Sequence, residues 1–364
     1  MPDFIPGLEL GRRFYQEAVR PLLDAHFAGV AHAAALIGAS SEVLGFDTAM
    51  STDHDWGPTV TLFLRDSEAH LSQPIHDLLS YQLPASFYGY AVHQQQYAED
   101  APTTSMVVKT EPPFNHRVFV TTAHAFCRRY LDLDIDQPMQ AADWLTISSQ
   151  QLGSLTAGAV YHDGVGELTD LRTRLAYYPR DVWLYLMAAS WQRISQEEHL
   201  MPRAGYVGDE LGSAVIGSRL VRDVMTLCFL IERQYAPYPK WFGTAFNRLA
   251  CAAVLTPILW RAQTAATWQD RETALCDAYE HLARLHNRLG VTEPLTEQCS
   301  NFFDRPFRVI HGERLATALL AAITDPDVKR IAQQRLIGSV DQFSDSTDLR
   351  ASPEWRARLK HLYD

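Results

Sequence analysis

The hydrophobic pattern of this chain changes near residue 178, and this change constrains the fold more than any other feature of the sequence. Before it, runs with the two-residue period of a strand alternate with runs of helical period. After it come long amphipathic helical patterns with almost no strand signal. The strands are predicted at 59–64, 117–122 and 159–161, and the helices at 8–27, 66–82, 123–131, 141–157, 182–194, 214–235 and 271–289. The sequence therefore predicts an α+β protein, with a small α/β domain containing a mixed sheet at 1–178 and an all-α helical bundle at 179–364.

Charge is also distributed unevenly between the two halves of the chain. The net charge is −11, and residues 1–178 hold 10 Lys and Arg against 21 Asp and Glu, whereas residues 179–364 hold 22 of each sign. Neutralisation of phosphates by basic side chains supplies most of the affinity for duplex nucleic acid. A duplex nucleic acid is therefore not an expected partner. An anion bound by the acidic half would need metal ions, or cationic side chains from the other half.

Cysteine usage and apolar run length predict where the protein resides. The five cysteines form no CxxC pair, and their odd number favours reduced thiols. The longest apolar runs are far shorter than the roughly 20 residues that a membrane span needs. The N-terminal residues also lack the pattern of a signal peptide. We expect a cytoplasmic protein that does not bind a membrane.

A glycine–serine turn followed by two closely spaced acids is the strongest candidate for chemistry. The turn holds Gly38, Ser40 and Ser41, and the acids are Asp53 and Asp55. Acids at positions i and i+2 of a strand point to the same face, about 7 Å apart, and can share Mg²⁺. A glycine–serine turn can offer backbone N–H groups and hydroxyls to phosphate. The alternative interpretation is a polar turn that precedes a strand.

This combination resembles the signature of the nucleotidyltransferase superfamily, which includes DNA polymerase β and the kanamycin and streptomycin nucleotidyltransferases. More closely, the chain resembles a family of uncharacterised bacterial proteins in that superfamily. The resembling blocks are 38–57, 161–168, 207–213, 235–241 and 337–341.

The resemblance implies a catalytic α/β domain followed by a helical domain that closes over the acceptor. It implies transfer of a nucleoside monophosphate from an NTP, expected to be ATP, to a hydroxyl of a small molecule or protein, with release of pyrophosphate. Asp53 and Asp55 would hold one or two Mg²⁺ ions, and Gly38, Ser40 and Ser41 would cradle the β- and γ-phosphates.

Two departures from the superfamily pattern weigh on this interpretation. His54 stands between the acids, where an apolar residue is usual, and on a strand it would face away from the metal. The superfamily also has a third carboxylate on a later strand, but 117–122 contains none, which leaves Glu111 and Asp163 as substitutes. The alternative is a non-catalytic nucleotide-binding or regulatory module, such as a component of a toxin–antitoxin pair.

Tyr238 and Lys240 are the nucleotide-binding candidates of the second half. They lie in a proline-interrupted segment after a long helix, and the resembling enzymes place a lysine and aromatic residues near the nucleotide. The other interpretation of Lys240 is a lysine that interacts with the C-terminus of the preceding helix.

Two further patterns of the second half involve charged and polar residues. Arg219 and Asp223, four residues apart on a helix, are predicted to form an intrahelical ion pair. Residues 338–348 repeat a glycine–serine pair followed by acids. We interpret them as a polar surface segment or a loop on the substrate side.

Overall fold

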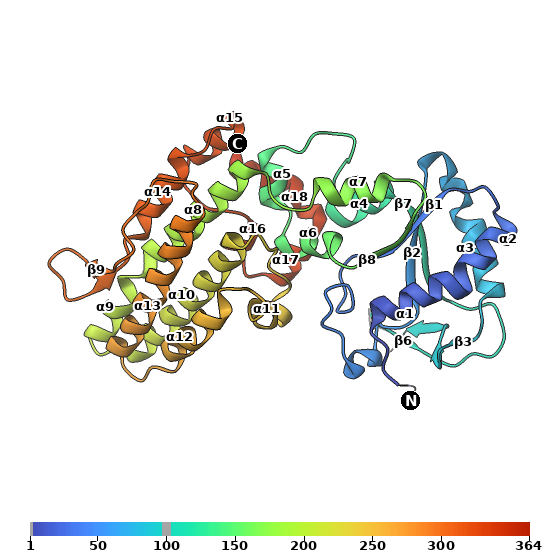
Figure 1. Ribbon diagram of the computed structural model, residues 1–364, viewed down its shortest axis with the longest axis horizontal. Helices are drawn as coiled ribbons and strands as arrows, with labels where there is room; N and C mark the ends of the chain where they lie inside the picture. The colour runs from blue at the N-terminus through green and yellow to red at the C-terminus, as the bar shows by residue number, and fades with distance from the viewer. Residues whose placement is uncertain (1–2, 97–102) are drawn as a thin grey trace. The chain divides into compact units, whose positions relative to one another are not determined.

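The computed structural model describes residues 3–96 and 103–364 (Figure 1). The chain divides into two compact units. Unit 1 consists of Met1–Pro138 and Gln151–Ala176, and unit 2 of Met139–Gln150 and Tyr177–Asp364. The α+β class predicted from the sequence is confirmed, since a mixed sheet is combined with many helices.

The central sheet of unit 1 has, among the described residues, four strands in the order β7-β2-β1-β8. Their bounds are β1 His32–Leu36, β2 Thr59–Leu64, β7 Arg117–Thr122 and β8 Ala159–Asp163. β1 is antiparallel to both β2 and β8, whereas β2 and β7 are parallel, so the sheet is mixed as predicted. Three of these strands were predicted, and β1 was not. Short antiparallel pairs are formed by β3 Ser86–Phe87 with β4 Tyr90–Ala91, and by β5 Gln94–Gln96 with β6 Thr104–Met106.

Helices cover both faces of this sheet. One face buries Val60 and Leu62 against Leu10 and Phe14 of the N-terminal helix, which Figure 1 shows lying across the sheet. On the other face, the ring of Phe63 contacts that of Phe126 at a centroid distance of 5.4 Å. The helices are α1 Gly7–Phe14, the π-helical turn η1 Tyr15–Val19, α2 Arg20–His26, the 3₁₀-helices η2 Ala49–Asp53 and η3 Asp66–Leu71, α3 Ser72–Gln82, α4 Ala123–Leu131, α6 Ser149–Thr156 and α7 Glu167–Arg174.

Unit 2 is built from helices around α8, which is buried on nearly all sides and carries the fully buried Trp183 and Trp191. A helix that is apolar all round belongs in the centre of a bundle. A two-stranded pair, β9 Ser300–Asn301 with β10 Arg308–Val309, interrupts the helices. The helices are α5 Ala141–Thr146, α8 Arg180–Glu197, α9 Leu200–Tyr206, α10 Glu210–Ile231, α11 Pro239–Phe246, α12 Ala252–Thr264, α13 Trp268–Arg288, α14 Gly312–Ala321, α15 Pro326–Ala332, α16 Val340–Phe343, α17 Thr347–Ala351, the 3₁₀-helix η4 Pro353–Trp355, α18 Arg356–Leu359 and the 3₁₀-helix η5 Lys360–Tyr363.

Residues 139–150 belong to unit 2, whereas the sequence pattern placed them in the first domain. The C-terminal segment accounts for this difference. Arg356 Nη2 donates to Asp143 Oδ1 at 2.9 Å, and the Tyr363 hydroxyl lies 3.4 Å from the backbone oxygen of Leu145. Contacts between residues about 200 positions apart leave no local signal in a hydrophobic pattern.

None of the helices in the described part of the chain combines the length and the apolar character that a membrane span requires.

Candidate functional site

Three segments of unit 1 meet at one edge of the sheet. β1 ends at Leu36, two residues before Gly38, and its antiparallel pairing with β2 aligns Ala35 with Thr61. The segment that follows β1 and the segment that precedes β2 therefore lie at the same edge. β7 runs parallel to β2 and begins there too, since Arg117 is in register with Thr59. The predicted turn and the predicted acids thus lie at a common edge.

The turn after β1 has the backbone conformation that its glycine allows. Gly38 has a φ of +108°, which residues with a Cβ atom rarely adopt. Its N–H donates to the backbone oxygen of Ser154 at 3.0 Å. The turn continues through Ser40 and Ser41, which are partly buried. The backbone of this turn is therefore held by α6, and the hydroxyl oxygen of Ser40 is buried.

Asp53 and Asp55 precede β2 but do not lie on a strand, so the predicted strand placement of the two acids is wrong. Asp53 is the last residue of η2, and β2 begins only at Thr59. Two sequence features explain the delay. Thr48 and Ser51 form a capping box that starts η2, and Gly57-Pro58 interrupts extended pairing because proline has no N–H to donate.

The two acids have different partners. Asp53, whose side chain is 60% exposed, has its Oδ1 atom 2.8 Å from Nδ1 of His54. His54 was expected to face away from the acids and instead contacts one of them. The Oδ1 atom of Asp55 accepts hydrogen bonds from the N–H and the hydroxyl of Thr104, at 2.8 and 2.9 Å. Asp55 also has a φ of +48°, which turns the chain between η2 and β2.

Arg117 is a residue of this edge that the sequence argument missed. Its Nε atom donates to Thr59 Oγ1 at 2.8 Å and its Nη2 atom to the backbone oxygen of Asp55 at 2.9 Å. Burial lowers the pKa of Arg117, and the negative charges of nearby Glu42 and Asp55 oppose that shift. The strand 117–122 contains no acid. Its first residue carries a cation instead, and that cation holds the segment containing Asp55.

Glu42 is a second residue that the sequence argument missed. It is 3% exposed, and the Ser41 hydroxyl lies 3.3 Å from its Oε2 atom. Burial raises the pKa of Glu42, and the charge of Arg117 opposes the shift. The sequence signal was available: a carboxylate directly after the glycine–serine turn.

Neither predicted substitute for a third carboxylate reaches this edge with a free side chain. Asp163 pairs with Ala33 in the β1–β8 register, whereas the turn follows the opposite end of β1. Its carboxylate accepts the N–H groups of Gly166 and Thr169 at 2.7 and 2.9 Å, at the start of α7. Glu111 lies on an exposed loop. Within residues 3–96 and 103–364, no group of three or more His, Cys, Asp or Glu side chains is arranged to hold a metal ion.

Tyr238 and Lys240 belong to unit 2. Tyr238 precedes the first turn of α11, and Lys240 lies in that turn, with its Nζ atom 5.5 Å from the centroid of the Trp241 ring. Lys240 is thus nine residues past the end of α10. Their predicted contact with a nucleotide stays a prediction.

Comparisons with known proteins find similarity to a family model and to solved structures. A family model described as a domain of unknown function, DUF4037, matches residues 144–242. Among solved structures, the chain is similar to a nucleotidyltransferase-like protein from Exiguobacterium sibiricum 255-15, with 12% identity over 95% of this chain and 88% of that chain and a TM-score of 0.34. No curated protein matches the chain. The matches name no substrate or metal for this protein.

Proposed function

We propose that the edge formed by residues 38–41, Asp53 and Asp55 binds a nucleoside triphosphate with Mg²⁺ and transfers its nucleoside monophosphate to an acceptor hydroxyl. The observation that carries this proposal is the β1–β2 register, which brings the glycine–serine turn and the two acids to the same edge of the sheet. ATP is the triphosphate to test first. The acceptor is a small molecule or a protein side chain.

The donor atoms at this edge fit Mg²⁺ in type. Magnesium is commonly held by one or two carboxylates together with substrate phosphates and water. Asp53 and Asp55 supply two carboxylates, and both residues are exposed, so water and phosphate oxygens can complete the coordination. When bound, the ion would neutralise charge on the phosphates.

The residues of the chain have distinct parts in the proposed reaction. The turn at Gly38 would orient the β- and γ-phosphates through its N–H groups and the hydroxyls of Ser40 and Ser41. The acceptor oxygen would attack the α-phosphorus, and the bond to the bridging oxygen would break as pyrophosphate leaves. The acceptor proton would pass to solvent. Arg117 would hold the Asp55 segment in place through the bond to its backbone oxygen. Positioning and charge stabilisation are the main sources of rate in phosphoryl transfer.

A second candidate is a nucleotide-binding or regulatory module without turnover, such as a toxin–antitoxin component. The observation that favours it is the identity of Arg117, the first residue of β7. A third carboxylate on this strand would help catalysis, but the residue there is a cation. Two carboxylates suffice for binding, and the strand 117–122 supplies no third carboxylate.

Calorimetry with ATP, in the presence and absence of Mg²⁺, separates these proposals when it is followed by a pyrophosphate-release assay over a panel of acceptors. We expect D53N and D55N to weaken Mg²⁺-dependent binding at least tenfold. D24N is the matched control, since Asp24 is an exposed acid of the same unit on α2. Binding without pyrophosphate release would favour the module, and an absence of Mg²⁺-dependent binding would exclude both functions.

A further inference from the structure

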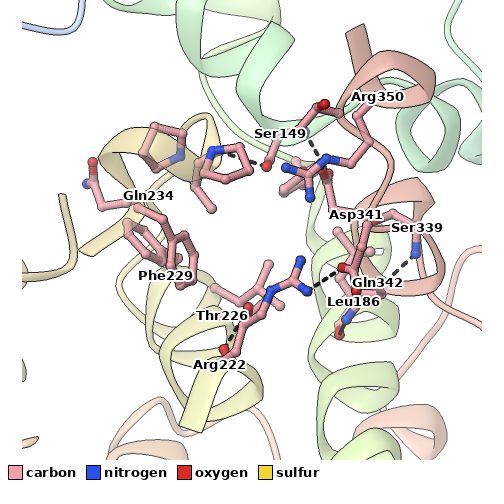
Figure 2. A pocket seen from close by; sticks show the side chains of 18 residues that line it. Ser149, Leu186, Arg222, Thr226, Phe229, Gln234, Ser339, Asp341, Gln342 and Arg350 are labelled. Carbon is pink, nitrogen blue, oxygen red and sulfur yellow. Dashed lines mark hydrogen bonds and ion pairs between the residues drawn. The ribbon is translucent and has the colours of Figure 1, made fainter. Parts of the chain in front are cut away.

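Unit 2 contains a cavity of about 430 Å³ that has no part in the proposed nucleotide site. Its lining comes from α8, α10, the start of α11, and the segment from Ser339 to Arg350 (Figure 2). Cavities of this size are typical of sites for small organic ligands. The cavity has an apolar wall and a charged wall, and each restricts what can bind.

The apolar wall carries aromatic rings. Phe229 of α10 and Phe242 of α11 have ring centroids 5.3 Å apart, and Pro237 and Pro239 continue this wall. Flat apolar surfaces of this kind pack against flat or aliphatic parts of a ligand.

The charged wall is centred on Arg350, which is only 6% exposed. Figure 2 shows its guanidinium group pointing into the cavity. Its Nε atom has no hydrogen-bond acceptor among the described residues, and its nearest carboxylate oxygen, Asp341 Oδ1, is 3.6 Å away. Asp341 is held in turn by the backbone N–H of Ser149, which donates to Oδ2 at 2.7 Å. A buried guanidinium with an unfilled donor is costly in an empty cavity and favourable beside an anion.

Arg222 enters the cavity from α10. It lies on the same helix face as Thr226 and Phe229, four and seven residues further on, which also line the cavity. Arg222 forms an ion pair with Asp345, whose side chain is 78% exposed. Solvent-exposed ion pairs of this kind contribute little to stability. A ligand anion can therefore replace Asp345 at small cost.

The charged neighbours of Arg222 on α10 pair with residues of α8 and do not compete for the Arg222 guanidinium. Arg219 pairs with Glu197 at 2.6 Å, and Asp223 pairs with Arg193 at 3.1 Å. The predicted Arg219–Asp223 pair is therefore wrong, because both residues face α8. This arrangement directs Arg222 to the cavity.

The segment that carries Asp341 is fixed to α8 before any ligand arrives. Gln342 donates from Nε2 to the backbone oxygen of Leu186 at 2.9 Å and to Ser190 Oγ at 2.7 Å. The backbone N–H of Ser339 donates to Gln342 Oε1 at 3.0 Å. Of the two interpretations of residues 338–348, a polar surface segment does not describe Ser339, which is buried, or Asp341, whose side chain is 14% exposed; both residues line the cavity.

We propose that this cavity binds a small organic anion, with one carboxylate or phosphate group between Arg222 and Arg350 and a flat apolar body against Phe229 and Phe242. Two guanidinium groups face the single, mostly covered carboxylate of Asp341 there, so the interior has a positive charge once Asp345 is displaced. The site lies within unit 2 and does not depend on the proposed nucleotidyl transfer.

The test uses calorimetry on the full chain with three probes: phenyl phosphate, phenylacetate and benzyl alcohol as the neutral analogue. We expect at least one of the two anions to bind at least fivefold more tightly than benzyl alcohol. Tighter binding of phenyl phosphate identifies a phosphate site, and tighter binding of phenylacetate identifies a carboxylate site; either supports the proposal. Absence of anion binding, or equal affinity for the neutral analogue, overturns it.

Variants locate the bound anion. R222Q should weaken anion binding at least fivefold without changing the affinity for benzyl alcohol. R219Q, one turn earlier on α10 and outside the cavity, should change neither. D345N should tighten anion binding two- to threefold, because it removes the acid that competes for Arg222. If R222Q and R219Q have the same effect, or if D345N weakens binding, the anion does not lie at this site.

Discussion

Arg117, the first residue of β7, donates a hydrogen bond from Nη2 to the backbone oxygen of Asp55 at 2.9 Å. This bond joins the strand on one side of β2 to the segment that leads into β2 and carries one of the two candidate metal ligands. The same guanidinium donates to Thr59 Oγ1 at 2.8 Å. Its positive charge also opposes the rise in the pKa of Glu42 that burial causes. One cation therefore holds the geometry of the edge without being a candidate ligand.

Replacing Arg117 by glutamine should destabilise the protein by about 1–3 kcal/mol, because charge-assisted hydrogen bonds are lost and Glu42 remains buried without its cation. Urea unfolding at pH 7 measures this loss. If nucleotide binding occurs at this edge, R117Q should also weaken it.

The charge relation to Glu42 is tested by a double-mutant cycle. In an E42Q background, R117Q should lower the free energy of unfolding by less than it does in the wild type, because no buried carboxylate is then left unpaired. Equal costs in the two backgrounds would show that Arg117 acts through its hydrogen bonds alone.

Gly158 should tolerate no side chain. Its φ is +70°, and a Cβ atom there would lie 2.1 Å from the backbone oxygen of Leu36, the last residue of β1. Its N–H also donates to the backbone oxygen of Val43 at 3.0 Å, which ties β8 to the turn after β1. G158A must therefore displace backbone at the proposed phosphate turn.

Gly29 is the matched control for this substitution. Its φ of +92° imposes the same kind of strain, but a Cβ atom there would meet nothing within 4 Å. We expect G29A to cost about 1 kcal/mol, as left-handed strain alone does, and G158A to cost at least about 2 kcal/mol more because of the steric clash. Thermal unfolding of the two variants gives the comparison, and similar losses would contradict the steric argument.

The sequence predicted the parts of the fold that have a local periodic signal. The three strands at 59–64, 117–122 and 159–161 alternate apolar residues or are β-branched, and all were found. β1 was missed because its sequence His-Ala-Ala-Ala-Leu has neither alternation nor β-branched residues, and every residue in it is buried. A fully buried central strand does not show the two-residue period.

The candidate site was predicted in part, for similar reasons. The sequence brought Gly38 and the two acids together through a motif, and strand register places them at one edge. It could not show that Gly57-Pro58 delays β2 past Asp55. Nor could it show that Thr104, 49 residues further along the chain, donates two hydrogen bonds to the Asp55 carboxylate. The cavity of unit 2 depends on contacts between α8, α10 and residues 339–350, which no local pattern encodes.

His286 should make the protein less stable as the pH falls from about 6.5 to about 4. Its Nδ1 atom accepts the indole N–H of Trp191 at 3.2 Å, so the ring must be neutral at that nitrogen. Burial lowers its pKa to about 4. The unfolded chain binds the proton first in this range, so acid favours unfolding.

Urea unfolding of the wild type and H286Q at pH 7 and pH 5 measures this effect. The stability difference between the two proteins should be smaller at pH 5, where the wild type has lost part of the contribution of His286. His116, whose pKa burial also lowers to about 4, titrates over the same range and leaves a residual dependence in H286Q. An unchanged difference between pH 7 and pH 5 would mean that His286 is not the titrating group.

Glu198 should make the protein less stable as the pH rises, which is the opposite of the effect of His286. This residue of unit 2 is 4% exposed, and its carboxylate accepts the N–H groups of Ile310 and Gly312 at 2.6 and 3.1 Å, at the start of α14. Burial raises its pKa to about 8 in spite of these two hydrogen bonds. Between about 4.5 and 8 the folded protein therefore holds a proton that the unfolded chain has released. The free energy of unfolding must fall as the pH rises through this range and level off above it.

Between pH 7 and 8.5 the ring protons of His286 and His116 have already been lost in both the folded and the unfolded chain. Burial also raises the pKa of the Cys127 and Cys228 thiols, which begin to lose protons only in the unfolded chain in this interval, so the comparison with E198Q is what isolates Glu198. A single proton contributes a slope of at most about 1.4 kcal/mol per pH unit. We expect wild-type stability to decrease from pH 7 to 8 and E198Q, which carries no titrating group there, to show a smaller decrease. The two glutamine variants then form a pair, since H286Q changes the acid limb and E198Q the alkaline limb of the same stability curve. If the stability of E198Q fell with pH as steeply as that of the wild type above pH 7, Glu198 would already be ionised in the folded protein. The two backbone hydrogen bonds would then lower its pKa more than burial raises it.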